Sequence, residues 1–204
     1  MGRFRTGKNQ MVPLRNSPHI LVSFGQALLR KSFGYIPRQP WIPFEAAAAI
    51  HSAALPSWRV WEVGSGFSTL WLSDRVDHVV SIEASKEWYQ LLKTRIDQEC
   101  IENVDLRYEW RGDLMSSFPE LEDETLDLLF VDGGPRGDCL INGLRKVRPG
   151  GYIYLDNWDN DAFWRITDRE FLRERAGLFQ STREFIDYVP SQVGVYAGLL
   201  LRKA

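Results

Sequence analysis

The sequence predicts an α/β protein with a doubly wound, mostly parallel sheet that ends in an antiparallel hairpin and follows an N-terminal helical extension. Three observations support this fold class: five short apolar runs alternate with helical stretches, two glycines directly follow the first run, and no helix separates the last two runs. Alternating strands and helices form parallel sheets because right-handed crossovers return each strand to the same direction. The 204 residues fit a single sheet domain.

The first 43 residues predict an extension that precedes the sheet. Ser17 and Pro18 have the character of a helix start, and Gly34 that of a helix end. Between them one apolar stripe recurs at helical spacing, made of Ile20, Leu21, Phe24, Ala27 and Leu28. Three prolines, Pro37, Pro40 and Pro43, then favour an extended connection. We therefore expect residues 1–43 to form an extension or lid and residues 44–204 to form the main domain.

The main domain begins with an alanine-rich helix over 44–55 that Pro56 ends. Strands are predicted over 59–64, 78–83, 104–110, 126–133 and 151–157, with helices over 86–100 and 137–147 among the connections. The runs "TREFIDYVP" and "GVYAGLLLRK" close the chain as two strands of a hairpin.

Composition excludes several classes of protein. Hydrophobic residues make up 44% of the chain, yet no apolar run approaches the roughly 20 residues that span a bilayer. The tract "HILVSFGQALL" is interrupted by Gly25 and Gln26 and has no cleavage site, so we expect a cytoplasmic protein without a membrane span. Two cysteines, Cys100 and Cys139, do not make a disulfide framework or a metal cage.

Charge is distributed unevenly along a chain whose net charge is −2. Residues 1–44 contain seven basic side chains and no acidic one, whereas the remainder contains 18 basic and 27 acidic side chains. The seven are Arg3, Arg5, Lys8, Arg15, Arg30, Lys31 and Arg38. A basic segment can dock on an anionic partner, or it can be a solvated arm or a lid over a bound cofactor, and both interpretations stay open.

The stretch "VWEVGSGFSTLWL" predicts a loop that holds a nucleoside cofactor. Gly64 and Gly66 let the backbone turn sharply after a strand and approach a ligand closely. A dinucleotide loop would have a third glycine where this chain has Thr69, and Glu62 suits a cation better than a diphosphate. The residues from Glu62 to Ser68 resemble the E/D-x-G-x-G-x-G motif of class I S-adenosylmethionine-dependent methyltransferases, with Ser68 replacing the last glycine.

This resemblance implies a Rossmann-like fold and S-adenosylmethionine as cofactor, held by the loop residues Glu62, Gly64, Ser65, Gly66, Ser68 and Thr69. Glu83 ends the next strand, 19 residues after Gly64, where a carboxylate can accept both ribose hydroxyls of a nucleoside. In the same family an acid after the third strand often faces the adenine amino group, and Asp113 is the matching residue. The resemblance covers residues 55–200, including "VRPGGYIYLDN".

Oxygen-bearing side chains follow the fourth and fifth predicted strands. Asp132, Asp156 and Asn157 are hard donors of the kind that Mg²⁺ and other divalent cations prefer. The set resembles the metal site of catechol and caffeoyl-coenzyme A type O-methyltransferases, in which the cation binds the acceptor's hydroxyls. The resemblance also places Asp132 at the reacting centre, beside the cofactor. A helix cap at Asp156 and Asn157 is the alternative interpretation of these two residues.

One departure from that family concerns the base. Its members carry a lysine three residues after the first aspartate, whereas this chain has Pro135, followed by Arg136. Three alternatives follow: a cation alone promotes deprotonation, Asp132 is the general base without a metal, or the acceptor differs in kind. Trp158, Phe163 and Trp164 are candidates either for an acceptor pocket wall or for the core.

The sequence predicts O-methylation of a small hydroxylated molecule or glycan precursor, assisted by a divalent cation. It argues against a nucleic-acid acceptor, because the fourth strand is followed by Asp132-Gly-Gly-Pro instead of a [DN]-P-P-[YFW] motif. The alternatives are an aminopropyl transferase of the same fold and a non-catalytic nucleotide-binding module that recruits a partner through its basic arm. The apolar stripe of the N-terminal helix is expected to cover the rim above Glu62 and Asp132, or to pair two subunits as a homodimer.

Overall fold

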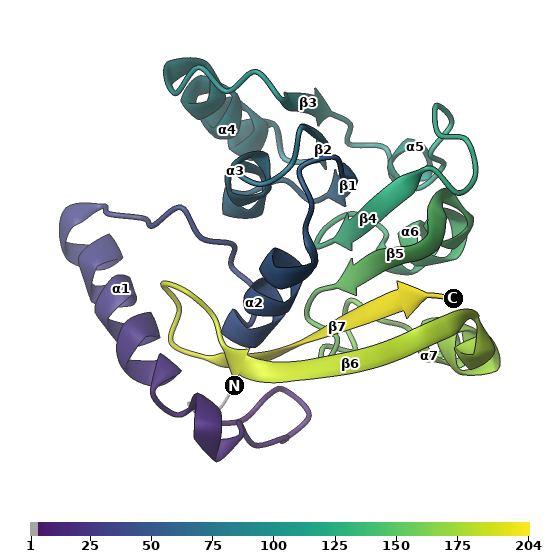
Figure 1. Ribbon diagram of the computed structural model, residues 1–204. Helices are drawn as coiled ribbons and strands as arrows, with labels where there is room; N and C mark the ends of the chain where they lie inside the picture. The colour runs from purple at the N-terminus through teal and green to yellow at the C-terminus, as the bar shows by residue number, and fades with distance from the viewer. Residues whose placement is uncertain (1–3) are drawn as a thin grey trace.

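A computed structural model describes residues 4–204, so Arg3 of the basic segment lies outside the described residues. Seven strands form one sheet in the order β3-β2-β1-β4-β5-β7-β6 (Figure 1). The neighbours among β1 to β5 are parallel, and β7 is antiparallel to both β5 and β6. The strands are β1 Arg59–Val63, β2 His78–Glu83, β3 Val104–Tyr108, β4 Leu126–Val131, β5 Val147–Leu155, β6 Phe179–Tyr188 and β7 Val195–Lys203. The predicted fold class, a mostly parallel sheet with an antiparallel final hairpin, is confirmed.

Helices flank the sheet and precede it. They are α1 His19–Phe33, α2 Phe44–Ala53, α3 Phe67–Ser73, α4 Lys86–Gln98, α5 Gly112–Met115, α6 Arg136–Gly143 and α7 Ile166–Glu174, with 3-10 turns η1 Leu14–Asn16, η2 Leu144–Lys146 and η3 Ala176–Leu178. Within residues 4–204 no helix is both long and apolar enough to cross a membrane.

Several boundaries differ from the sequence-based expectation, among them those of α1, α6 and β5. Ser17 and Pro18 were expected to start the helix as cap and first turn, but Pro18 holds the N-cap position of α1, without a side-chain hydrogen bond. The helix expected over 137–147 divides into α6 and η2. Strand β5 begins at Val147 because a register shift beside β4 accommodates Gly150, whose φ is +76°, within the strand.

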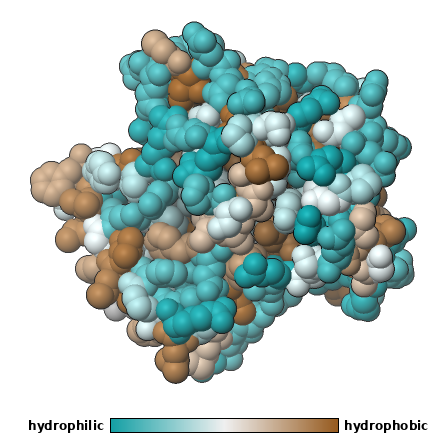
Figure 2. Space-filling view, viewed as in Figure 1, coloured by the Kyte–Doolittle hydropathy of each residue, from teal (hydrophilic) through white to brown (hydrophobic). Residues whose placement is uncertain are grey.

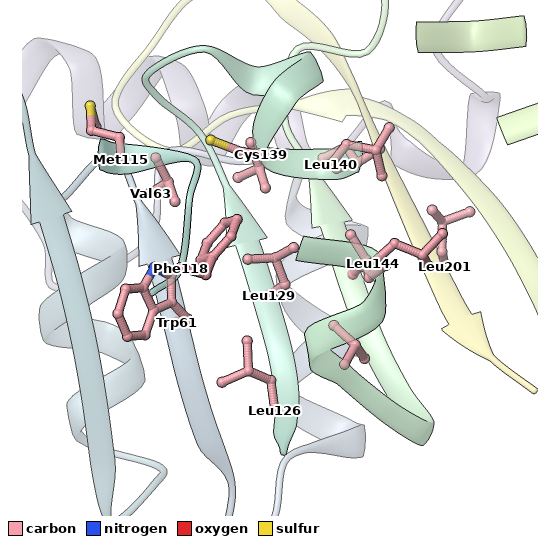
Figure 3. Packing of buried hydrophobic residues seen from close by; sticks show 14 of the residues in the cluster. Trp61, Val63, Met115, Phe118, Leu126, Leu129, Cys139, Leu140, Leu144 and Leu201 are labelled. Carbon is pink, nitrogen blue, oxygen red and sulfur yellow. The ribbon is translucent and has the colours of Figure 1, made fainter. Parts of the chain in front are cut away.

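The two faces of the sheet carry separate apolar cores. Alternate residues point to opposite faces of a strand. Trp61, Val63 and Leu129 therefore pack with Met115 of α5 and Leu140 of α6 on one face (Figure 3). On the other face Val60, Leu128, Phe130 and Tyr154 pack with residues of α2 and α3. Both cysteines are free thiols, Cys139 buried and Cys100 exposed.

Helix α1 attaches to the domain through its polar side. The His19 Nδ1 atom lies 2.8 Å from an Asp187 carboxylate oxygen, and the Ser23 hydroxyl donates to the Val189 carbonyl at 2.9 Å. Leu21, Phe24 and Leu28 are exposed at 76%, 57% and 55%. The expectation that this stripe covers the rim above the site is therefore wrong, because hydrogen-bonding side chains occupy the inner face of the helix.

Three basic residues of the extension pair with acids of the domain. Lys8 contacts Asp161 at 2.8 Å and Arg15 contacts Glu45 at 3.0 Å. Arg38 contacts both Asp74 and Glu99. Each partly exposed pair contributes about 1 kcal/mol at most, so together they orient the extension more than they stabilise it. These three positive charges of the extension are thus paired with negative charges of the domain.

The loops after β1 and β4 touch through their backbones. Gly64 has a φ of +91°, and a Cβ atom built on it would lie 2.6 Å from the Gly133 nitrogen. A Cβ on Gly133 would lie 2.6 Å from the Gly64 Cα. Only glycine combines the left-handed backbone of position 64 with this close approach.

We expect Gly64→Ala to lower the free energy of unfolding by about 2 kcal/mol or more, because both the backbone strain and the clash with position 133 act on it. Chemical denaturation monitored by circular dichroism measures the change. Gly177→Ala is the matched control, since nothing lies within 4 Å of a Cβ at that exposed glycine. An equal, small effect of both variants would contradict the packing argument.

Candidate functional site

The site lies where the parallel strands end on one edge of the sheet. Hydrogen bonds between neighbouring strands continue past the strand ends: the Asp132 N–H donates to the Val63 carbonyl at 2.8 Å, and the Asp156 N–H donates to the Val131 carbonyl at 3.0 Å. Asp132 and Asp156 are therefore neighbours beside the glycine loop. In open α/β sheets this edge is where ligands bind.

Glu83 holds the glycine loop in place. Its two carboxylate oxygens accept the backbone N–H groups of Ser65 at 3.1 Å and of Ser85 at 2.7 Å. The Trp88 indole N–H donates to the Ser65 carbonyl at 2.6 Å. Burial raises the pKa of Glu83, although these N–H donors oppose the shift. The carboxylate thus lies directly against the backbone of the predicted cofactor loop.

Glu62 lies fully buried beneath the same loop. The hydroxyls of Thr69 and Ser81 both donate to its Oε2 atom, while Thr69 Oγ1 also accepts the Gly66 N–H at 2.9 Å. The Glu62 Oε1 atom is buried without a hydrogen-bond partner. Burial raises the pKa of Glu62 to about 7, against the hydroxyl donors that lower it. Glu62 therefore shapes the loop from below through Thr69.

A cavity of about 290 Å³ opens above the glycine loop, and we name it the loop cavity. It is lined by Trp41, Ser65, Gly66, Phe67, Ser68, Trp88 and Asp132. Four of the predicted cofactor residues thus line one hollow, and Gly64 makes the turn beside it. Asp113, by contrast, lies exposed in the single turn of α5.

A second cavity, of about 240 Å³, adjoins the first, and we name it the carboxylate cavity. It is lined by Trp41, Asp132, Asp156, Asn157, Val189, Gln192 and Tyr196. All three predicted metal ligands therefore face one hollow. The alternative of a helix cap at Asp156 and Asn157 is wrong, because turns follow Asn157 and α7 begins only at Ile166. Within residues 4–204 no cluster of three His, Cys, Asp or Glu side chains is placed to bind a metal ion.

Arg136 neutralises the acidic pair. Its buried guanidinium donates to Asp132 Oδ1 at 3.0 Å, to the Asp132 carbonyl at 2.7 Å and to the Asp156 carbonyl at 2.6 Å. The Tyr154 hydroxyl donates to Asp156 Oδ1 at 2.8 Å. Burial raises the pKa of Asp132 to about 6 against the Arg136 charge, and burial together with the Asp132 charge raises that of Asp156 well above its ordinary value. Ionisation of Asp132 therefore opposes ionisation of Asp156.

Trp41 is a site residue that sequence reasoning missed. It lines both cavities, and its indole Nε1 is buried without a hydrogen-bond partner. The only signal was its position between Pro40 and Pro43 in a connection expected to be extended. The three aromatic residues considered for an acceptor wall have other contacts. Trp164 is in the core, Phe163 stacks on Arg136 and Trp158 packs against Trp164.

Comparisons with known proteins agree with this geometry. The family model described as a methyltransferase domain matches residues 61–158. A Klebsiella pneumoniae protein described as a candidate O-methyltransferase is 19% identical, with a TM-score of 0.62 over 90% of this chain and 97% of that one. The O-methyltransferase TomG from Streptomyces achromogenes, solved with S-adenosylmethionine, is 18% identical, with a TM-score of 0.61 over 90% of this chain and 89% of that one. At these identities the likeness establishes the fold. No sequence among the curated proteins matches this chain.

The raised pKa of Glu62 predicts a specific dependence of stability on pH. The unfolded chain has the ordinary value of 4.5, so ionisation of the buried carboxyl costs folding free energy that is absent below pH 4.5 and complete above about 7. Glu62→Gln stays neutral, so its stability relative to the unmodified protein should rise by up to about 3 kcal/mol from pH 4.5 to 8. Urea unfolding at several pH values measures this difference. Glu170→Gln, at an exposed position, should show no such trend, and a pH-independent difference for Glu62→Gln would refute the argument.

Proposed function

We propose that the chain contains a class I S-adenosylmethionine-dependent methyltransferase domain and that it methylates an oxygen of a small hydroxylated molecule or glycan precursor. One observation carries the proposal: the loop cavity and the carboxylate cavity meet at Asp132 and Trp41, which line both. A methyl donor on one side of this junction can face an acceptor hydroxyl on the other.

The loop cavity fits the cofactor chemically. Backbone groups of Ser65 and Gly66 line it, and Glu83 lies against the same loop, where its carboxylate can accept ribose hydroxyls. The rings of Trp41, Phe67 and Trp88 offer apolar surface and π-faces, which favour a sulfonium cation. We assign Glu62 and Thr69 to shaping the loop and Asp113 to the adenine end of the cofactor.

Methyl transfer requires that the methyl donor and the acceptor hydroxyl are correctly positioned and that a group accepts the proton of that hydroxyl. When bound, the cofactor would supply an electrophilic methyl group from its sulfonium sulfur to the acceptor oxygen, and the acceptor hydroxyl would lose its proton. Asp132 is the carboxylate at the junction, and a hydrogen bond from Arg136 fixes its orientation. We therefore propose that Asp132 accepts the proton when no cation is bound in the carboxylate cavity, a role that general bases of matched pKa perform. No lysine is needed in this loop.

The carboxylate cavity also fits a divalent cation. Asp132, Asp156 and Asn157 present hard oxygen donors to one hollow. Burial and the Asp132 charge raise the pKa of Asp156, and a bound cation would oppose that shift. We propose that these three side chains hold Mg²⁺ or a similar ion. Such an ion would lower the pKa of an acceptor hydroxyl and orient it. We also propose a cytoplasmic location, since both cysteines are free thiols.

We expect S-adenosylmethionine and its demethylated product to bind, and NAD not to bind. Glu83→Ala should weaken cofactor binding by about 1.5–3 kcal/mol, or roughly 10-fold to 150-fold, because hydrogen bonds to a charged acceptor are lost. Isothermal titration calorimetry measures both effects. Glu102→Ala changes an exposed acid and is the control. Tighter binding of NAD than of S-adenosylmethionine would refute the cofactor assignment.

The reaction itself is tested with S-adenosylmethionine that carries an isotopically labelled methyl group. We expect mass spectrometry of cell extract incubated with the protein to detect a small molecule labelled on oxygen. Exhaustive chelation and Asp156→Asn should each lower the rate at least about 10-fold, whereas Asp97→Asn, an exposed change on α4, should not. Full activity after chelation would refute the proposed role of the cation and leave Asp132 as the general base. A label on nitrogen or carbon would overturn the proposal.

A further inference from the structure

Helix α1 presents an apolar face to solvent. Five side chains of this face are exposed by 42% or more: Leu21, Val22, Phe24, Leu28 and Leu29. Together with Gly25 and Ser32 they form what we name the outer face of α1. Figure 2 shows hydrophobic surface at the side of the molecule where Figure 1 places α1. A contiguous exposed patch of this kind marks an interaction site.

Hydrogen bonds on the inner face fix the orientation of α1. On the inner face Ser23 is buried, and its hydroxyl donates to the Val189 carbonyl and contacts that of Gln192, while Gln26 accepts the Ser191 N–H. The carboxylate of Asp187 holds His19 at the start of the helix. Rotating α1 to bury the outer face would break these hydrogen bonds. The apolar residues therefore need a partner from outside the chain.

The charge pattern selects the kind of partner. No charged residue lies on the outer face, and Lys31 only borders it. Lys8, Arg15 and Arg38 are engaged with acids of the domain, so they are not free to bind an anionic surface. An uncharged apolar face with few free cations beside it suits an equally uncharged apolar face. We propose that the outer face of α1 pairs with the same face of a second copy of this chain.

A two-fold axis gives this pairing a definite geometry. Gly25 is close to the middle of α1, and no atom lies within 4 Å of a Cβ built on it, so a second helix can approach closely there. Antiparallel packing about an axis near Gly25 brings Leu21 of one helix toward Leu29 of the other, and Val22 toward Leu28. A standard interface buries about 800 Å² per partner. Exposed apolar side chains beyond the outer face, Leu14, Phe33 and Tyr35, extend the surface toward that size.

Pairing of two copies would affect the carboxylate cavity through the inner face of α1. The residues that Ser23 and Gln26 hold belong to the turn between β6 and β7, whose Val189 and Gln192 line the carboxylate cavity. A helix fixed between two domains fixes this wall of the cavity. This consequence rests on the proposed function, whereas the pairing itself does not.

Light scattering coupled to size-exclusion chromatography tests the pairing without any assay of activity. We expect the unmodified chain to elute at twice the mass of one chain, and the double variant Leu21→Glu/Leu28→Glu to elute as a monomer with an unchanged circular dichroism spectrum. Ile166→Glu is the control: it places the same charge on an apolar residue that is 75% exposed on α7, and it should stay dimeric.

Two outcomes would overturn the proposal. The first is a monomeric unmodified chain at 50 µM or a concentration of that order, and the second is a dimer that the double variant does not dissociate. Vesicles of phosphatidylcholine and phosphatidylserine provide the decisive comparison if the chain is monomeric. Sedimentation with these vesicles, lost in the double variant, would assign the outer face to a membrane surface instead.

Discussion

The contact between the loops after β1 and β4 is the constraint on which the site depends. Gly64 and Gly133 approach so closely that neither position has space for a Cβ atom. The contact requires β1 and β4 to be neighbours, as they are in the sheet, and it brings the glycine loop against the segment that carries Asp132. The loop cavity and the carboxylate cavity share Asp132 for this reason. A wider separation of the two loops would part the cofactor loop from the carboxylate.

Buried carboxyl groups at this junction are stabilised in different ways. Glu83 accepts two backbone N–H groups, Glu62 accepts two hydroxyls, and Asp132 faces the Arg136 guanidinium. A buried ion pair offsets desolvation only when further hydrogen bonds satisfy its remaining groups, and the contacts of Arg136 with two carbonyl groups meet that condition. Burial and the charge of Asp132 together raise the pKa of Asp156, whose carboxyl group accepts the Tyr154 hydroxyl. Ionisation of Asp132 and ionisation of Asp156 are therefore linked.

Sequence patterns predicted the parts of the fold that depend on local periodicity. The strand from 78 to 83 was predicted to the residue, and those that begin at 59, 104 and 126 end within two residues of the prediction. The alternation of strands and helices predicted the sheet, and strand ends predicted that Asp132, Asp156 and Asn157 share one hollow. The inward direction of Ser23 and Gln26 on α1 was not predictable, since periodicity located the apolar stripe but could not detect hydrogen bonds to a turn more than 160 residues away. Trp41 was missed for the same reason: its role depends on two loops that meet only in the folded chain.

The N-terminal extension supplies part of the wall of the site. Its polar anchors attach α1 to the β6–β7 turn, and its proline-rich connection then carries Trp41 to the junction of the two cavities. Ion pairs of Arg38 with Asp74 and Glu99 hold that connection against the ends of α3 and α4. Residues far apart in sequence, Trp41 and Gln192, thereby become two walls of one cavity. The sheet positions the carboxylates, whereas the extension determines the shape of the space in which an acceptor would meet them.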